Sequence, residues 1–344
     1  MEHKHSLKFL SLLSILFLFA GCQGAPSTFS PASTSGVVIS DLMALAFSIA
    51  GVVFVIVEGL LLFSILKFRQ RGKSETGKNN LPVQNEGNKI FETAWTIAPA
   101  IVLAIIFYVS VVAYGSVENL PSPSKGTADK LQTINVRAVG YQWWWFFEYP
   151  DLKIKTANEY HVPVGTVVTL SVEAADVIHS YWVPQLGRKV DAIPGHTTHS
   201  WFKATETGVF TGECAELCGE QHAEMRFQVI VDSPEDFQNW VKQQQSLPPK
   251  MTGLAAEGEQ IFMKGSCKTC HNIEGTNAKG LFGPDLTHIA SRQIIAGGIM
   301  ENNLENMTKW LTNPTAVKPA AKMPNLGLTQ DQVSALVAFI YNLK

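Results

Sequence analysis

The sequence has 344 residues, which is long enough for two or three domains that each bury their own core. A net charge of −2 gives no indication of nucleic-acid binding, and 46% hydrophobic with 16% charged residues is an apolar balance for a soluble protein. Most of the apolar excess lies before residue 115, so the N-terminal part is the candidate membrane segment.

Residues 1–22 have the organisation of a secretory signal. Lys4 and Lys8 precede an apolar run over 9–20, and the segment ends in Ala-Gly-Cys22. The Gly-Cys end resembles a bacterial lipoprotein box and predicts lipidation of Cys22; the alternative is an ordinary signal peptide with an incidental cysteine. Residues 23–36 are rich in Ser, Thr, Pro and Ala, which predicts a flexible tether.

Two apolar segments predict a transmembrane hairpin over residues 37–115. The spans, about 38–66 and 94–114, both reach the roughly 20 residues that cross a bilayer. The basic residues between them are Lys67, Arg69, Arg71, Lys73, Lys78 and Lys89. A basic loop is cytoplasmic, so the chain is predicted to lie in the bacterial cell membrane as a multi-pass protein, with everything after residue 115 on the outer face. Glu58, inside the first span, predicts contact with protein rather than lipid.

From residue 130 to 232 the apolar pattern changes to a period of two. Residues 133–139, 167–173 and 225–231 alternate or are β-branched and are separated by Gly and Pro turns, which predicts an all-β Greek-key sandwich or barrel. Residues 233–253 contain several prolines and are predicted to be a domain linker, in which a short helix over 235–245 is compatible with the sequence.

Residues 254–344 predict an all-α domain. Thr329 and Gln332 form a capping box before an apolar helical face, Asn303 is placed to cap a second helix, and residues 255–262 suit a third. The predicted fold class is therefore a multi-domain membrane protein with a two-helix hairpin, an all-β domain and an all-α domain.

The stretch from Cys214 to Met225 carries a soft set of potential metal ligands. Cys214, Cys218, His222 and Met225 offer two thiols, an imidazole and a thioether within twelve residues. Two cysteines and two histidines would also suit zinc, which remains open on ligand type alone. A weak thioether ligand is typical of copper electron-transfer sites, so the pattern favours copper.

The sequence Cys267-Lys-Thr-Cys270-His271 is the attachment signature of c-type haem. The two thiols add to the vinyl groups of the haem, and His271 is the predicted proximal iron ligand. A redox disulfide or half of a zinc site is the alternative for Cys-x-x-Cys without the histidine. Met323, in an irregular segment before the last helix, is the predicted sixth ligand, since Met300 and Met307 fall on helical apolar faces.

At this point the chain resembles subunit II of a haem–copper cytochrome c oxidase with a cytochrome c domain fused at its C-terminus. The resemblance covers nearly everything after residue 37. It rests on the stretch 214–225, on the aromatic run Gly140-Tyr-Gln-Trp-Trp-Trp-Phe-Phe-Glu-Tyr149, and on His179-Ser-Tyr-Trp-Val-Pro184. The resemblance implies a cupredoxin domain over residues 130–232 and a cytochrome c domain over 254–344.

The same resemblance implies a dinuclear copper centre. Cys214 and Cys218 would be the bridging thiolates, His179 and His222 would each ligate one copper, and Met225 and the backbone carbonyl of Glu216 would be weak ligands. The Glu216 side chain would also ligate a magnesium ion at the boundary with the catalytic subunit.

Two further roles follow from the resemblance. Trp143 would be the point of electron entry into the copper centre, while its alternative is a residue of the strand core. Glu92, just before the second span, would lie at the mouth of a proton pathway, while its alternative is a solvated carboxylate at a helix N-terminus.

The resemblance implies the electron-entry subunit of a respiratory terminal oxidase. Electrons would pass from external cytochrome c or another donor to haem c, then to copper and then to subunit I. Subunit I would reduce oxygen to water and couple this to proton translocation, and further membrane subunits would complete the complex. A nitric-oxide reductase subunit and a free-standing membrane-tethered electron carrier are alternatives. A quinol-oxidase subunit shares the fold but lacks the copper ligands, and the intact ligand set argues against it.

Overall fold

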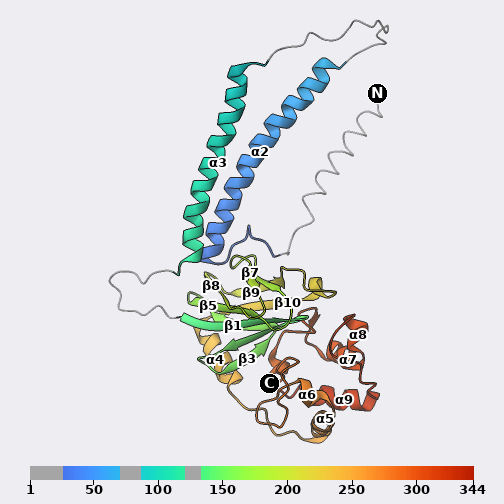
Figure 1. The fold of residues 1–344 in the computed structure, drawn as a ribbon. Coiled ribbons are helices and arrows are strands. Elements are labelled where there is room, and N and C mark those ends of the chain that lie inside the picture. The colour runs from blue at the N-terminus through green and yellow to red at the C-terminus, as the bar shows by residue number, and fades with distance from the viewer. Residues whose placement is uncertain (1–25, 70–86, 121–132) are drawn as a thin grey trace, which may run out of the picture. The chain divides into compact units, whose positions relative to one another are not determined.

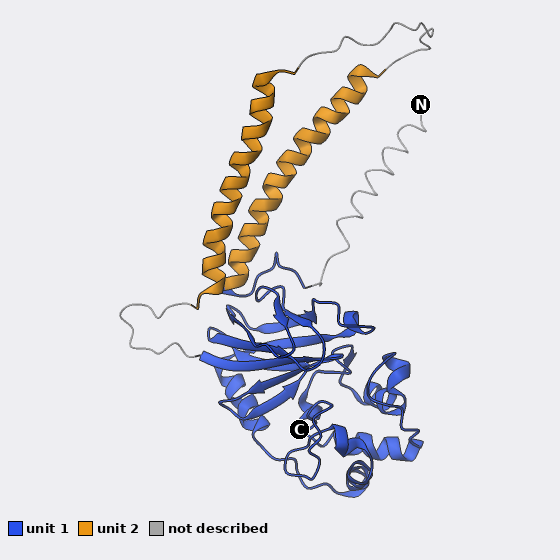
Figure 2. Cartoon of the chain, viewed as in Figure 1, with its two compact units in different colours: residues 1–34, 130–344 blue, residues 35–129 orange. Residues whose placement is uncertain are grey.

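The computed structural model describes residues 26–69, 87–120 and 133–344, so Cys22 and most of the basic loop lie outside the described residues. The chain divides into two compact units (Figure 2). One unit takes in the chain up to residue 34 together with residues 130–344, and the other takes in residues 35–129.

The second unit contains two long helices, α2 (Thr34–Phe68) and α3 (Lys89–Glu118) (Figure 1). Both are long and apolar enough to cross a membrane, and their large apolar side chains are exposed as a lipid environment requires. Asn88 caps α3 by accepting a hydrogen bond from the Ile90 backbone N–H. The predicted two-helix hairpin is confirmed, and Glu58 is half-buried within α2.

Residues 133–232, hereafter the β-domain, form two five-stranded sheets (Figure 1). The first sheet has the order β3 (Ile154–Ala157), β2 (Trp144–Tyr149), β1 (Thr133–Tyr141), β5 (Val167–Ala174) and β8 (Thr198–Lys203). The second has the order β4 (Glu159–Pro163), β10 (Arg226–Asp232), β9 (Gly208–Cys214), β6 (His179–Trp182) and β7 (Val190–Ala192). The β1–β5 and β4–β10 pairs are parallel, and the other pairs within the sheets are antiparallel.

The core of the β-domain explains the aromatic run. Side chains alternate across a strand, so Trp145 and Phe147 of β2 are fully buried while Trp144 and Phe146 are only half-buried. Phe227 of β10 packs against both buried rings, with ring centroids 5.5 Å from each. The two sheets therefore enclose one aromatic core, as the period-two pattern predicted.

The prediction of a flexible tether over residues 23–36 is wrong for its C-terminal part, which includes Ala32 and Ser33. Ala32 and Ser33 are fully buried against the β-domain. The Ala32 N–H donates to the carbonyl of Gln185 at 2.8 Å, and the Ser33 hydroxyl donates to the carbonyl of Leu186 at 2.6 Å. Small side chains allow this close approach, which composition alone does not reveal.

The segment predicted as a linker begins with an ordered helix, α4 (Pro234–Gln244). Ser233 caps it, and Phe237 and Val241 are buried in the β-domain core. Trp240 stacks on His161 with ring centroids 4.6 Å apart. A flexible connection over the whole of 233–253 is therefore not what the structure shows, because α4 belongs to the β-domain.

Residues 253–344, hereafter the helical domain, complete the same unit. Its elements are α5 (Gly253–Lys264), α6 (Cys267–Cys270), η2 (Ile289–Ser291), β11 (Ile294–Ile295), β12 (Met300–Glu301), α7 (Leu304–Thr312), α8 (Pro314–Val317) and α9 (Gln330–Ile340). Phe262 of α5 packs on Phe339 of α9, and the predicted caps at Asn303 and Thr329 are both present. The predicted all-α domain is confirmed, with one two-stranded β-hairpin that the sequence did not predict.

Replacing Phe237 by Ala should destabilise the β-domain by about 3 kcal/mol, because a buried aromatic ring leaves a cavity. Thermal unfolding of the purified chain measures the effect. The matched control is Gln238→Ala on the exposed side of α4, which should change the midpoint little. Equal midpoints for the two variants would contradict the packing of α4 on the β-domain.

Candidate metal and haem sites

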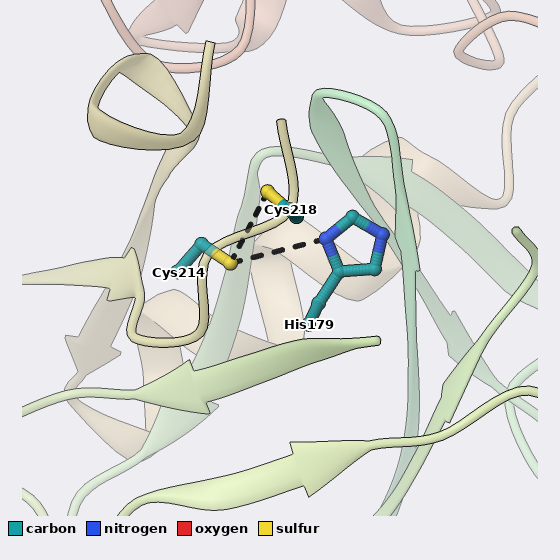
Figure 3. Close-up of side chains that lie close together, drawn as sticks. All are labelled: His179, Cys214 and Cys218. Carbon is teal, nitrogen blue, oxygen red and sulfur yellow. Dashed lines mark hydrogen bonds between the residues drawn. The ribbon is translucent and has the colours of Figure 1, made fainter. Parts of the chain in front are cut away.

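Three potential metal ligands meet at one end of the β-domain (Figure 3). Cys214 ends β9, His179 begins β6, and Cys218 lies in the loop that follows β9. The Cys214 Sγ lies 3.7 Å from the Cys218 Sγ and 3.8 Å from the His179 Nδ1. Within the part of the chain that the structure describes, these buried side chains form the one cluster of three such ligands.

The remaining predicted copper ligands surround this cluster. The His222 Nδ1 lies 3.7 Å from the Cys218 Sγ, and the Sδ of the fully buried Met225 lies 3.8 Å from the same sulfur. The carbonyl oxygen of Glu216 lies 3.2 Å from the Cys214 Sγ. Each sulfur thus faces one imidazole, as well as one weaker donor.

The strand pairing and one short turn fix these positions. The Cys214 N–H donates to the carbonyl of Met225 at 3.0 Å, which joins the two ends of the loop. A 3-10 turn, η1 (His222–Glu224), then directs His222 back toward Cys218. Ligands that are close in sequence are therefore held by a closed loop, and His179 is brought to them by the pairing of β6 with β9.

The electrostatics of the two cysteines favour a bound cation. The hydrogen bond between the two thiols lowers the pKa of Cys214 and raises the pKa of Cys218. Since two thiolates at this distance repel each other, loss of the second proton needs a neighbouring positive charge. The sulfurs are also too far apart for a disulfide, so both are free to bind a metal.

Asp176 orients the imidazole of His179, and sequence reasoning missed it. Its carboxylate lies 2.8 Å from the His179 Nε2, which leaves Nδ1 directed at Cys214. Burial alone would lower the pKa of His179, but the hydrogen bonds to Asp176 and Cys214 outweigh burial and raise the pKa. The only signal in the sequence for this role was that Asp176 lies three residues before His179.

The haem signature lies at the start of the helical domain. Cys267 and Cys270 are the first and last residues of α6, and His271 follows directly. The His271 Nδ1–H donates to the carbonyl of Pro284 at 2.8 Å, which leaves Nε2 free for iron. Burial lowers the pKa of His271, so the ring is neutral, as a metal ligand must be.

The surroundings of His271 fit a bound haem. A Cβ at Gly283 would lie 2.6 Å from the His271 Cε1, so only glycine leaves room for the ring in this orientation. Met323 is half-buried and packs on the same apolar cluster as Cys267. Met307 is buried in that cluster on helix α7, as predicted, whereas the prediction of a helical position for Met300 is wrong, because Met300 lies in β12 of the hairpin.

Comparison with known proteins relates each part of the chain to one family. Residues 26–112 match the transmembrane domain of cytochrome c oxidase subunit II, and residues 153–233 match its periplasmic domain. The cytochrome c oxidase subunit 2 of Alkalihalophilus pseudofirmus is 32% identical over 99% of this chain and 98% of the relative. The chain belongs to the cytochrome c oxidase subunit II family.

Other matches place the haem and copper parts within this family. Residues 255–344 match cytochrome c, and the cytochrome c oxidase subunit 2 of Bacillus sp. strain PS3 is 37% identical over 95% of this chain and 94% of the relative. The quinol oxidase subunit 2 of Bacillus spizizenii is 32% identical over 71% of this chain and 74% of the relative. Membership implies copper and haem binding and a membrane protein with a periplasmic domain.

Trp143, which the family resemblance implies is the point of electron entry, contacts residues 214–225, hereafter the copper loop. Its indole Nε1–H donates to the carbonyl of Cys218 at 3.1 Å. The Gln142 side-chain amide donates to the same carbonyl at 2.7 Å, a contact that the sequence did not predict. The half-buried indole is therefore coupled through one hydrogen bond to the backbone of a predicted copper ligand.

The side chains of two further residues with predicted roles, Glu92 and Glu216, are exposed. Glu92 is an exposed residue in the first turn of α3, as its helix N-terminal alternative also predicts. The Glu216 side chain is exposed beside the copper loop, so it is accessible to an ion or a partner.

Replacing Asp176 by Asn should weaken copper binding roughly 10- to 100-fold, because the hydrogen bond that orients His179 is weakened. A competition titration of the copper-loaded chain against a chelator measures the change. Asp191→Asn, at an exposed position in β7, is the control and should keep the affinity of the parent. An unchanged affinity in Asp176→Asn would show that the carboxylate does not orient the ligand.

Proposed function

We propose that this chain is the electron-entry subunit of a membrane-bound terminal oxidase. Electrons from an external donor would enter at haem c, pass to a dinuclear copper centre and continue to the catalytic subunit, where oxygen reduction is coupled to proton translocation. The observation that carries the proposal is the convergence of two thiols, one imidazole, a thioether and a carbonyl from one loop with the imidazole of His179 from β6, within 3.2–3.8 Å of one another in successive pairs.

The copper centre would be held by His179, Cys214, Glu216, Cys218, His222 and Met225. Cys214 and Cys218 would supply the thiolates of this site, and the copper held there would serve as a one-electron carrier. The chain contributes a closed loop in which the Cys218 carbonyl accepts from Trp143, and Asp176 holds His179 of β6 beside it, so movement of the ligands is limited. Quinol oxidase relatives share the fold, so the intact ligand set is what favours copper here.

The haem would be attached through Cys267 and Cys270, with His271 and Met323 as iron ligands. A haem with a methionine ligand supplies a one-electron carrier of raised reduction potential. The Pro284 carbonyl fixes the tautomer of His271, and Met323 is partly buried against the apolar cluster of the helical domain.

The surface around the copper loop supports a catalytic subunit as partner. Leu217, between the two cysteines, is 77% exposed, and Ile178, next to His179, is 48% exposed. Apolar side chains exposed around a buried metal site are typical of a surface that a partner covers. The exposed Glu216 carboxylate beside them would be the ligand for magnesium at this boundary.

The predicted boundaries complete the proposal. Residues 1–22 would be a signal peptide that ends at a lipidated Cys22, and residues 254–344 would be the cytochrome c domain on the outer face of a bacterial membrane. Glu92 would open a proton pathway on the cytoplasmic side of α3.

The purified chain should contain two coppers and one haem and should give an electron paramagnetic resonance signal delocalised over both coppers. Metal analysis and the spectrum of the oxidised chain measure this. Cys218→Ser should abolish the delocalised signal because one bridge is lost. Zinc, or a single localised copper, in the parent chain would contradict the dinuclear site.

Met323→Leu should lower the haem reduction potential by on the order of 100 mV or more, because the thioether ligand that raises it is lost. Potentiometric titration of the full chain measures the shift. The conservative variants Met300→Leu and Met307→Leu are controls and should retain the parent potential. A large shift in either control with none in Met323→Leu would reassign the sixth ligand.

Turnover of the complex copurified with this chain distinguishes the two acceptors. Oxygen consumption with little nitric-oxide reduction is expected for a terminal oxidase. The opposite preference would favour a nitric-oxide reductase, and recovery of the chain without a catalytic partner would favour a free-standing carrier.

A further inference from the structure

Within one compact unit, two short segments of the helical domain make most of its hydrogen bonds to the β-domain, and a further bond runs from the Gln244 side-chain amide of α4 to the Ser291 hydroxyl. The segments are residues 292–298, which include the start of the β-hairpin, and residues 318–322, which follow α8. Their contacts are made largely by buried charged or backbone groups rather than by an apolar patch.

Lys318 lies in the helical domain, and its side chain reaches into the β-domain. The residue is only 3% exposed. Its Nζ donates to the carbonyls of Glu224 at 2.7 Å and Trp143 at 3.1 Å, and to Ala296 of its own domain at 3.1 Å. An ammonium has three N–H donors, and all three are used, which fixes both the position and the direction of the side chain.

Glu159 makes the converse contact from the β-domain. This strand β4 residue is also 3% exposed. Its carboxylate accepts from the backbone N–H of Gln293 at 2.7 Å and of Ile294 at 3.4 Å, both in the helical domain. A buried charge on each domain therefore binds backbone groups of the other, so removing either partner leaves unpaired polar groups in a buried interface.

Gly297 permits a close approach between the domains. Its φ is +75°, and its carbonyl accepts from the Arg226 N–H at 2.9 Å. A Cβ at this position would lie 2.5 Å from the Lys318 Nζ and 2.6 Å from the Trp143 carbonyl oxygen. Any larger residue would push the two domains apart at the point where Lys318 binds.

The other segment, residues 318–322, connects the candidate haem ligand Met323 to the candidate electron-entry residue Trp143. Lys322 donates to the Gln142 Oε1 at 2.9 Å and lies 5.9 Å from the ring centroid of Trp143. The next residue is Met323. Since the Trp143 indole is hydrogen-bonded to the carbonyl of Cys218, the path from Met323 to the copper loop consists of one peptide bond and a few direct contacts.

We propose that Lys318, Glu159 and Gly297 form a docking contact that holds the haem domain in one fixed position beside Trp143 and so sets the rate of haem-to-copper electron transfer. Lys318 and Glu159 are positioning residues that act through Trp143 and the segment ending at Met323. This inference rests on the proposed electron route. In this arrangement, a permanent contact takes the place of diffusion of the haem domain on the linker that joins it to the β-domain.

The docking contact also predicts how transfer responds to salt. Surface charges that steer two proteins together are screened at ionic strengths near 0.1 M. The charges of Lys318 and Glu159 are buried and paired with backbone, so added salt should leave the parent transfer rate unchanged. A variant without the contact would have to redock in each cycle and should become salt-sensitive.

The test uses the full chain loaded with copper and haem, in which the haem is reduced by a laser-triggered reductant and copper reduction is followed in time. Lys318→Met should slow the first-order transfer by on the order of tenfold or more, because buried carbonyls lose their donor. Amide hydrogen exchange at Arg226, whose N–H crosses the interface, should accelerate by a similar factor. Lys309→Met, at an exposed lysine of α7, is the control and should match the parent in both measurements.

A second pair of variants tests the contact without touching a charge. Gly297→Ala should also slow transfer and accelerate exchange at Arg226. Gly165→Ala is the matched control, because its φ of +77° is almost the same while no atom lies within 4 Å of the added Cβ. It carries the same backbone strain and should leave electron transfer unchanged.

The outcomes separate this inference from the function on which it rests. Failure of the parent chain to reduce copper from haem would contradict the proposed function. Normal transfer in the parent, with unchanged rate and exchange in both Lys318→Met and Gly297→Ala, would overturn the docking contact alone. Slower transfer with unchanged exchange would also overturn it, since Lys318 would then act through local electrostatics.

Discussion

The metal site depends on two neighbouring thiols that cannot both lose their protons unless a positive charge lies beside them. The buried Sγ atoms of Cys214 and Cys218 lie 3.7 Å apart, where two negative charges repel strongly. Metal cations relieve that repulsion, so the loop, the sandwich that supports it and Asp176 behind His179 are arranged for a bound metal. Binding of copper is thus linked to the final form of the loop, and the rest of the chain delivers electrons to it or anchors it to a membrane.

The connection between the haem and copper domains differs from that of two proteins joined by a flexible tether. Helix α4 is part of the β-domain core, which leaves only about eight residues, 245–252, between the two domains. Across the interface the contacts are specific and mostly to backbone groups, as at Lys318 and Glu159. Such contacts have strict geometry, so they favour one arrangement of the two domains over many loosely packed ones.

Much of the site could be predicted from the sequence, for a physical reason. The candidate ligands within 214–225 and 267–271 are close along the chain, so their spacing alone predicts a shared site. His179 comes from β6 and Trp143 from the turn between β1 and β2, both distant in sequence from 214–225, and they were found only through the family resemblance. Lys318 and Glu159 could not be predicted, because each binds backbone groups that leave no pattern in the side chains. The buried end of the predicted tether, Ala32 and Ser33, was missed for the same reason.

The most direct test of the account is whether electrons move between the two sites within one chain. In the copper- and haem-loaded full chain, the rate constant for copper reduction after a pulse that reduces the haem should be independent of protein concentration over a hundredfold range. That result is expected if the haem domain is already docked beside Trp143. A rate that rises in proportion to concentration would show transfer between separate molecules and would contradict the intramolecular relay.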